Sequence, residues 1–196
     1  MKQACSSLIG MKKSIILLLV ILFSLSVYPQ QPGKVTLEWG ARKEQVKLNE
    51  VKLNLATTIF GSYPEVSYER VLDSDMSVGI SAGVGLADEY SLNFALIPYF
   101  RWFFGGSHET LQKYGAGFYL EANGAIFSYE YNDYDYYGGA FYSDTAVEAG
   151  TGLGLAVGWK YLTKNNWVGD FFIGGGRDFM RDGGYMRMGI SIGKRF

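Results

Sequence analysis

Charged residues of both signs recur at alternate positions in segments whose other positions are apolar. Ten of them are predicted to point toward one interior: Lys52, Arg101, Lys160, Arg187, Arg195, Glu65, Glu69, Glu121, Glu148 and Asp170. Successive side chains of a strand point to opposite faces, so this spacing separates the charges from the apolar residues. Buried charges persist only when they are paired and hydrogen-bonded. The sequence therefore predicts an ion-pair network, and a narrow ion or water pore is the alternative that the same residues allow.

Hydrolytic chemistry has less support in the sequence. Acyl-transfer sites generally pair a serine with a histidine base. The single histidine, His108, falls in a predicted turn beside Glu109, and no serine stands near it on a regular face. We therefore expect no catalytic residues and no enzyme, with a lipid A-modifying enzyme as the less favoured alternative.

Metal and cofactor chemistry is not expected either. The only cysteine, Cys5, lies in a segment that we predict to be removed. Asp133, Asp135 and Gly138 faintly resemble a calcium loop, but further ligand oxygens at regular spacing are missing. Glycine runs such as 174–176 lack the lysine and the helix of a phosphate loop.

Residues 129–144 are the most unusual stretch, with six tyrosines and four acidic residues. Tyrosine offers contact area at low entropic cost, and glycine offers adaptability, as in antibody paratopes. We predict an exposed loop that binds an extracellular protein or a glycan. The alternative is that the two flanking strands extend past the membrane and end in exposed aromatic residues. The contacting residues would be Tyr131, Tyr134, Tyr136, Tyr137 and Tyr142.

The elements that must position these residues are eight alternating segments. They span residues 51–60, 64–72, 76–86, 92–104, 115–128, 145–161, 167–177 and 185–196. Each supplies the roughly 9–11 residues that a tilted strand needs to cross a bilayer. Leu55, Thr57 and Ile59 are expected to point outward on the first segment, and Leu92 on the fourth. The predicted fold is all-β, an eight-stranded antiparallel up-and-down transmembrane β-barrel.

Aromatic residues gather at the ends of these segments, as they do at membrane interfaces. One belt would comprise Trp102, Phe104, Trp159, Tyr161, Trp167 and Phe196. Candidates for the other belt are Tyr63, Tyr90, Tyr129 and Tyr185. Glycines on the third and sixth segments would leave room inside for Arg101 and Glu121.

The N-terminal part reads as an export signal. Lys12 and Lys13 precede an apolar run, which predicts a signal peptide over residues 1–30, with Met11 as an alternative start. Residues 31–50 would form a periplasmic segment and residues 51–196 the barrel. Removing the signal leaves 15 of the 18 basic residues against 19 acidic ones, a net charge of −4. This balance argues against a nucleic-acid partner, which requires clustered positive charge.

The terminal segment Ile190-Ser-Ile-Gly-Lys-Arg-Phe196 carries a family resemblance. Over residues 46–196 the chain resembles the small eight-stranded outer-membrane barrels of Gram-negative bacteria, the OmpX type and the OmpA transmembrane domain. The resemblance implies an integral outer-membrane protein that contacts outer-membrane lipid. It also implies that the barrel-assembly machinery reads Ile190, Ile192 and Phe196. Lys194 departs from the apolar residue usual at its position.

Several roles remain open within this family, from adhesion and defence to envelope stability and, rarely, lipid chemistry. We expect a plugged, salt-bridged barrel that acts in envelope structure or surface interaction through extracellular loops. A soluble lipocalin-like carrier would need apolar residues inside and polar ones outside, the reverse of the predicted pattern.

Overall fold

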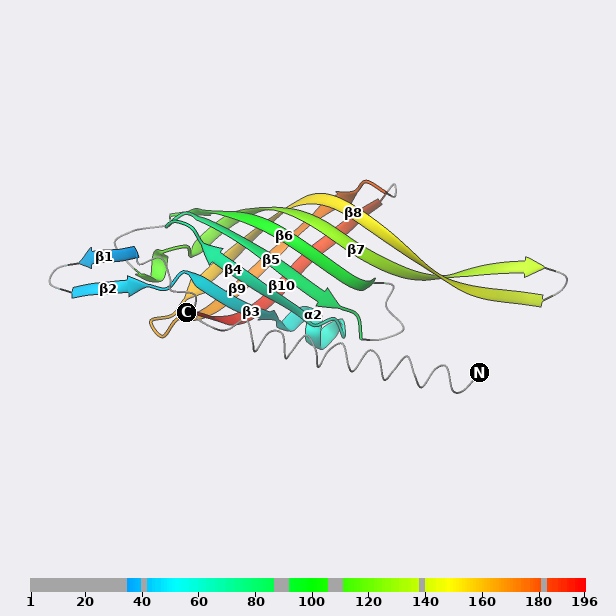
Figure 1. Cartoon of the computed structure of the whole chain (residues 1–196), viewed down its shortest axis with the longest axis horizontal. Helices are drawn as coiled ribbons and strands as arrows, with labels where there is room; N and C mark the ends of the chain where they lie inside the picture. The colour runs from blue at the N-terminus through cyan, green and yellow to red at the C-terminus, as the bar shows by residue number, and fades with distance from the viewer. Residues whose placement is uncertain (1–34, 40–41, 87–91, 106–110, 138–139, 181–182) are drawn as a thin grey trace. The chain divides into compact units, whose positions relative to one another are not determined.

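The computed structural model describes residues 35–39, 42–86, 92–105, 111–137, 140–180 and 183–196. Its barrel strands are β3 (Asn49–Asn54), β4 (Glu65–Val71), β5 (Met76–Val84), β6 (Leu92–Phe104), β7 (Gly117–Tyr137), β8 (Ala140–Leu162), β9 (Trp167–Asp178) and β10 (Gly183–Arg195). They form a closed barrel in the order β10-β3-β4-β5-β6-β7-β8-β9 (Figure 1). All neighbours are antiparallel, and β10 closes the barrel by pairing with β3. The predicted eight-stranded up-and-down barrel is confirmed.

Alternation along the strands separates an apolar exterior from a polar interior. On β5, Met76, Val78 and Ile80 are exposed, while Ser77 and Ser81 are buried. The terminal strand repeats the pattern, because its methionines and isoleucines are exposed and its arginines are buried. The two faces have the composition that a barrel with a lipid-facing outside and a polar inside requires.

Two further strands precede the barrel. β1 (Val35–Trp39) and β2 (Arg42–Val46) pair antiparallel with each other and form a separate two-stranded sheet. The barrel begins at Asn49, two residues before the predicted start at Val51. The predicted signal peptide, with its alternative start at Met11, lies outside the described residues.

The first predicted strand is wrong in its second half. Residues 55–60 form the short helix α2 (Leu55–Phe60) instead of continuing β3. The Asn54 side chain accepts a hydrogen bond from the Thr57 backbone N–H at 3.4 Å, and the Thr57 and Thr58 hydroxyls donate to the Asn54 carbonyl. Asparagine and threonine commonly make such local bonds, which compete with a strand ladder. The sequence did not reveal that Asn54 caps a helix, because the apolar alternation continues through Ile59 and predicts a strand.

The predicted loop at residues 129–144 is also wrong, and the alternative is right, because the two flanking strands extend and form a β-hairpin. β7 runs to Tyr137 and β8 starts at Ala140, with these two residues paired across a two-residue connection. Tyrosine favours strands, and adjacent strands pair at little loop-closure cost. The polar composition suggested a loop, but tyrosine's strand propensity and the short connection favoured the ladder.

At the hairpin end of the barrel, several side chains point to a different side of the wall than expected. The β6–β7 pairing shifts between Leu92 and Phe94, and Leu92 packs with the inner cluster of Ala95, Ala125 and Phe127 instead of pointing outward. Tyr63, Tyr129 and Tyr185, expected in an outer belt, pack against the same cluster. Tyr90 lies outside the described residues.

The opposite end of the barrel holds the short turns and Phe196, and we call it the turn end. Large exposed aromatic side chains ring it: Trp102, Phe104, Trp159, Tyr161, Trp167 and Phe196. Within it, the 3₁₀ turn η1 (Leu111–Lys113) precedes β7. The Nζ of Lys194 lies 5.2 Å from the centre of the Trp167 ring. In the part of the chain that the structure describes, no helix has the length and apolarity needed to cross a membrane.

Candidate functional site

Arg101 lies at the centre of a charge cluster inside the barrel. From β6, its Nε donates to Glu121 at 2.8 Å, and its Nη1 donates to Glu69 at 2.9 Å and to Asp170 at 2.6 Å. The guanidinium also lies 4.6 Å and 4.3 Å from the ring centres of Tyr99 and Tyr119. One fully buried cation on β6 therefore joins β4, β7 and β9.

Glu69 on β4 is the acceptor that most of the cluster shares. Lys52 donates to it at 2.5 Å, Lys160 also donates to it, and the Ser77 hydroxyl donates at 2.6 Å. Lys52 reaches across to Asp170 at 2.8 Å. The hydroxyls of Tyr99 and Tyr119 complete the shell around Glu69 and Asp170 at 3.2 Å and 2.6 Å. Charge-assisted bonds of this kind are the strongest that side chains make.

At the hairpin end, Arg187 extends the cluster. Its Nε donates to Glu121 at 2.6 Å and its Nη1 to Glu65 at 3.2 Å, while its Nη2 lies 3.4 Å from the Ser81 hydroxyl. The arginine thus joins β10 to β7, β4 and β5.

At the turn end, Arg195 closes the cluster. Its Nε donates to Glu50 at 2.7 Å, and its Nη1 and Nη2 donate to the carbonyls of Tyr114 and Gly115 at 2.6 Å and 3.1 Å. Glu50 also accepts from Lys160 at 3.0 Å. Burial, with the nearby carboxylate of Asp73, raises the pKa of the Tyr114 hydroxyl.

These contacts define an interior network of ten residues with balanced charge. It contains five cations and five carboxylates: Lys52, Arg101, Lys160, Arg187, Arg195, Glu50, Glu65, Glu69, Glu121 and Asp170. Each is at least nine-tenths buried and ion-paired to another member. An eight-stranded barrel is just wide enough for side chains to fill it. The network links the strands of the wall to one another from within.

Inward glycines make room for aromatic rings in this interior rather than for Arg101 and Glu121. A Cβ at Gly79 would lie 2.4 Å from the Tyr99 ring, and one at Gly158 would lie 2.5 Å from the Tyr119 ring. At Gly150 the added atom would overlap the ring of Phe127. These rings in turn support the network, because the hydroxyls of Tyr99 and Tyr119 bond its carboxylates.

Nine of the ten sequence-predicted interior charges belong to this network. Glu148 lies on β8 opposite Tyr129 and is half-buried, and the contacts that define the network do not include it. Glu50 was missed, because residues 31–50 were expected to precede the barrel. The signal that could have identified it was its place in an alternating series with Lys52 and Asn54, two and four residues later, which are both buried on β3.

The β7–β8 hairpin continues past its neighbours as a two-stranded ribbon (Figure 1). β6 pairs with β7 only as far as Tyr129, and β9 pairs with β8 only from Gly152. Beyond these points neither strand has a second strand partner among the described residues. Of the five tyrosines predicted for surface contact, Tyr131, Tyr134, Tyr136 and Tyr137 lie on β7 and Tyr142 lies on β8.

The remaining predicted residues lie elsewhere. Ile190 and Ile192 are exposed on the outer face of β10, at 55% and 45%, and Phe196 is also exposed at the turn end. The backbone of Phe196 exchanges two hydrogen bonds with Asn49, at 2.7 Å and 3.1 Å, which ties the chain end to the first barrel strand. His108 lies outside the described residues.

Comparison with known proteins gives one structural likeness. No family model matches the chain, and no curated protein matches it. The chain is similar to the crystal structure of the N-terminal β-barrel domain of Pseudomonas aeruginosa OprF, with 18% sequence identity and a TM-score of 0.44. The likeness covers 76% of this chain and 98% of that one.

Proposed function

We propose that this protein is an integral β-barrel of the outer membrane of a Gram-negative bacterium. Its charge network plugs and cross-links the interior, and its β7–β8 hairpin acts at the cell surface. The observation that carries the proposal is that the usual distribution of side chains in a soluble protein, apolar inside and charged outside, is reversed. Ten charged side chains are buried inside the barrel, and large apolar side chains cover its outside.

The outer surface supports a membrane environment. Leu153, Leu155, Phe171, Met186 and Ile190 are each more than half exposed. Soluble proteins rarely expose large contiguous apolar surfaces. A closed barrel satisfies its backbone hydrogen bonds between its own strands, which is the condition for crossing lipid as β-structure. The exposed aromatic residues at the turn end match the interfacial girdle of such barrels.

The membrane proposal is tested by fractionation and a cold detergent gel. We expect the protein in the outer-membrane fraction, and we expect the unheated form to migrate differently from the boiled form. A protein recovered from the periplasm or medium, with no mobility shift, would contradict the proposal.

The hairpin supports a role in surface interaction. Among the described residues, no further strand pairs with β7 beyond Tyr129 or with β8 before Gly152. A partner strand could add to such an edge through main-chain hydrogen bonds. Its sequence contributes tyrosines, which are favoured contact residues. We propose an extracellular protein or a glycan as the partner.

A trimmed hairpin separates this role from the barrel. Deleting residues 132–137 and 140–145 joins Tyr131 and Ala146 through the natural two-residue connection. An even number of residues is removed from each strand, so the remaining side chains keep their faces. Cells producing the trimmed protein should lose retention on protein-coated surfaces and on glycan arrays, whereas the barrel should still shift on a cold gel.

The matched controls replace the five tyrosines without shortening the ribbon. Changing Tyr131, Tyr134, Tyr136, Tyr137 and Tyr142 to threonine keeps strand propensity and removes the aromatic contacts. The same five changed to phenylalanine keep the rings. Loss of retention with threonine and its survival with phenylalanine is expected. Equal retention by the intact and trimmed proteins would contradict a binding role for the hairpin.

A narrow pore is the alternative function. The ten-residue network fills the lumen between Glu50 and Glu65, so the described interior favours a plug. A lipid A-modifying activity would need a base, and the network's carboxylates are all engaged with cations. We propose a non-enzymatic protein.

A further inference from the structure

We propose that the barrel wall has a side opening between α2 and β10 that takes up one acyl chain of a membrane lipid. The inference rests on the proposed membrane location and goes beyond it, because it assigns a binding site in the barrel wall. It also differs in place from the β7–β8 hairpin, so the two sites can be tested separately.

The wall is incomplete at the hairpin end of β10. β3 ends at Asn54, opposite Ser191, so residues 183–190 of β10 have no strand partner on that edge in the described structure. The Asn54 side chain makes the last connections. Its amide donates to the Met188 carbonyl and its oxygen accepts from the Ile190 N–H, each at 3.3 Å. Above this point the barrel is not closed by a ladder.

The short helix α2 stands where the missing strand would be. It lies against β10 and has only six residues, none of them buried. Ile59 and Phe60 are 67% and 81% exposed. A helix this short has little intrinsic stability, and one that buries no side chain gains little from packing. Elements with few buried contacts open locally at low cost, so α2 is a weak cover for the opening.

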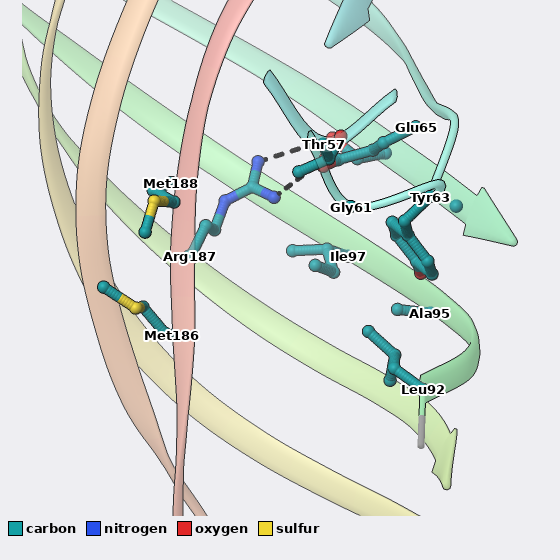
Figure 2. Close-up of a pocket in the computed structure, with 12 residues that line it drawn as sticks. Thr57, Gly61, Tyr63, Glu65, Leu92, Ala95, Ile97, Met186, Arg187 and Met188 are labelled. Atoms are coloured by element: carbon teal, nitrogen blue, oxygen red, sulfur yellow. Dashed lines mark hydrogen bonds and ion pairs between the residues drawn. The ribbon is translucent and has the colours of Figure 1, made fainter. Parts of the chain in front are cut away.

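A cavity of about 510 Å³ lies behind this cover (Figure 2). This is within the range of roughly 300–1,000 Å³ typical of small-ligand sites. Its apolar lining includes Leu92, Ala95, Ile97, Met186 and Met188. In Figure 2 the two methionines lie on one side of β10 and Arg187 on the other. Residues from both faces of β10 line the cavity, so it reaches the edge of the strand rather than lying behind it.

The composition of the cavity favours an acyl chain over a charged headgroup. Arg187 and Glu65, the charged residues in the lining, are engaged with each other, and Arg187 also bonds Glu121. The lining is continuous with the exposed outer face of β10, through Met186, Met188 and then Ile190. A chain lying against that face would meet apolar side chains along its whole path inward.

One polar atom inside the cavity needs a partner. The Tyr63 Oη is buried, and no atom of the described residues accepts its hydrogen. Tyr63 and Ala95 both line the cavity, and Tyr63 packs against the cluster that contains Ala95 (Figure 2). A buried hydroxyl without a partner costs free energy. The ester carbonyl that begins a lipid acyl chain would supply the missing acceptor.

The test is photolabelling of the intact barrel in phosphatidylcholine vesicles. A fraction of the phosphatidylcholine carries a diazirine close to the ester end of one acyl chain, and adducts are mapped by mass spectrometry after irradiation. We expect adducts on the inward residues Leu92, Ala95 and Ile97, as well as on outward residues such as Phe94. Tyr119 and Phe172, buried nearer the centre, should remain unlabelled.

A filling variant tests the cavity itself. Ala95→Phe should reduce adducts at Leu92 and Ile97 by about tenfold or more, since each buried methylene contributes about a factor of four in binding. Ala122→Phe makes the same replacement on the outer face of β7 and should leave these adducts unchanged. Both variants are checked for folding by their mobility on a cold gel.

The wild-type labelling pattern decides the matter even if Ala95→Phe does not fold. Adducts confined to outward residues would overturn the side opening while supporting the membrane barrel. Absence of adducts on every residue, outward ones included, would overturn both the side opening and the membrane location.

Discussion

Lys52 and Asp170 are separated by 118 residues in the chain, and their side chains meet at 2.8 Å inside the barrel. The contact spans the barrel closure, since Lys52 lies on the first barrel strand and Asp170 on the strand before the last. Bringing two residues this far apart in the chain together costs conformational entropy, and the contacts of the whole barrel are needed to offset that cost. The contacts of the network therefore form only in the completed barrel. Removing one member should weaken the contacts of the others.

Removing the central cation should be strongly destabilising. Arg101→Met leaves Glu69, Glu121 and Asp170 each without one of its cationic partners in a buried site. Breaking a buried ion pair in this way costs about 3–5 kcal/mol. The expected result is a lower urea midpoint for loss of the folded band on a cold gel. Arg70→Met makes the same replacement at an exposed position and should change the midpoint little. Equal midpoints for the two variants would contradict the network's stabilising role.

Conductance should separate a plug from a pore. The purified wild-type barrel is expected to give no current steps above background in a planar bilayer, because paired side chains fill its lumen. The double variant Arg101→Ala with Glu69→Ala removes one charge of each sign and shortens both side chains, so water and ions gain space. We expect current steps from this variant only. Discrete steps from the wild-type protein would instead support the alternative of a narrow pore.

Inward glycines should be intolerant of a methyl group where they contact a ring. A Cβ at Gly158 would lie 2.5 Å from both the Tyr119 ring and the Phe171 carbonyl. Overpacking of this kind costs about 1–3 kcal/mol. Gly158→Ala should lower the midpoint of urea unfolding. Gly169→Ala is the matched control, because its added Cβ would meet nothing within 4 Å. A Gly158→Ala barrel as stable as the control would show that the interior is looser than these contacts require.

The chain end should affect assembly more than stability. We propose that the barrel-assembly machinery reads Phe196 with Ile190 and Ile192. Phe196→Ala should therefore reduce the amount of folded barrel in the outer membrane several-fold. Phe171→Ala, at another exposed aromatic on the outer face, should reduce it less. Pulse-chase labelling followed by cold gels measures this amount. The urea midpoints of the assembled fractions should be similar, and a lower midpoint for Phe196→Ala alone would assign its effect to stability.

The sequence by itself determined the number of barrel strands and the face of most of their residues. Alternation is a local property with a period of two, so it is legible without knowing which strand lies beside which. It therefore placed Arg101, Glu121, Asp170 and Arg187 inside before any pairing was known. It could not show which cation meets which carboxylate, because those contacts depend on the register of all eight strands and on closure of the barrel.

Tertiary structure decided where strands end and which way side chains point at the positions where the alternation of the sequence is misleading. Apolar alternation continued past Asn54, yet Asn54 bonds β10 and caps α2, so β3 ends there. A shift in register turned Leu92 inward, and pairing across a two-residue connection extended β7 and β8 through the polar, tyrosine-rich stretch. At Asn54 and Leu92 the deciding contacts come from β10 and β7, which local alternation cannot identify. In the hairpin the deciding contact is pairing between two strands that are neighbours in the sequence.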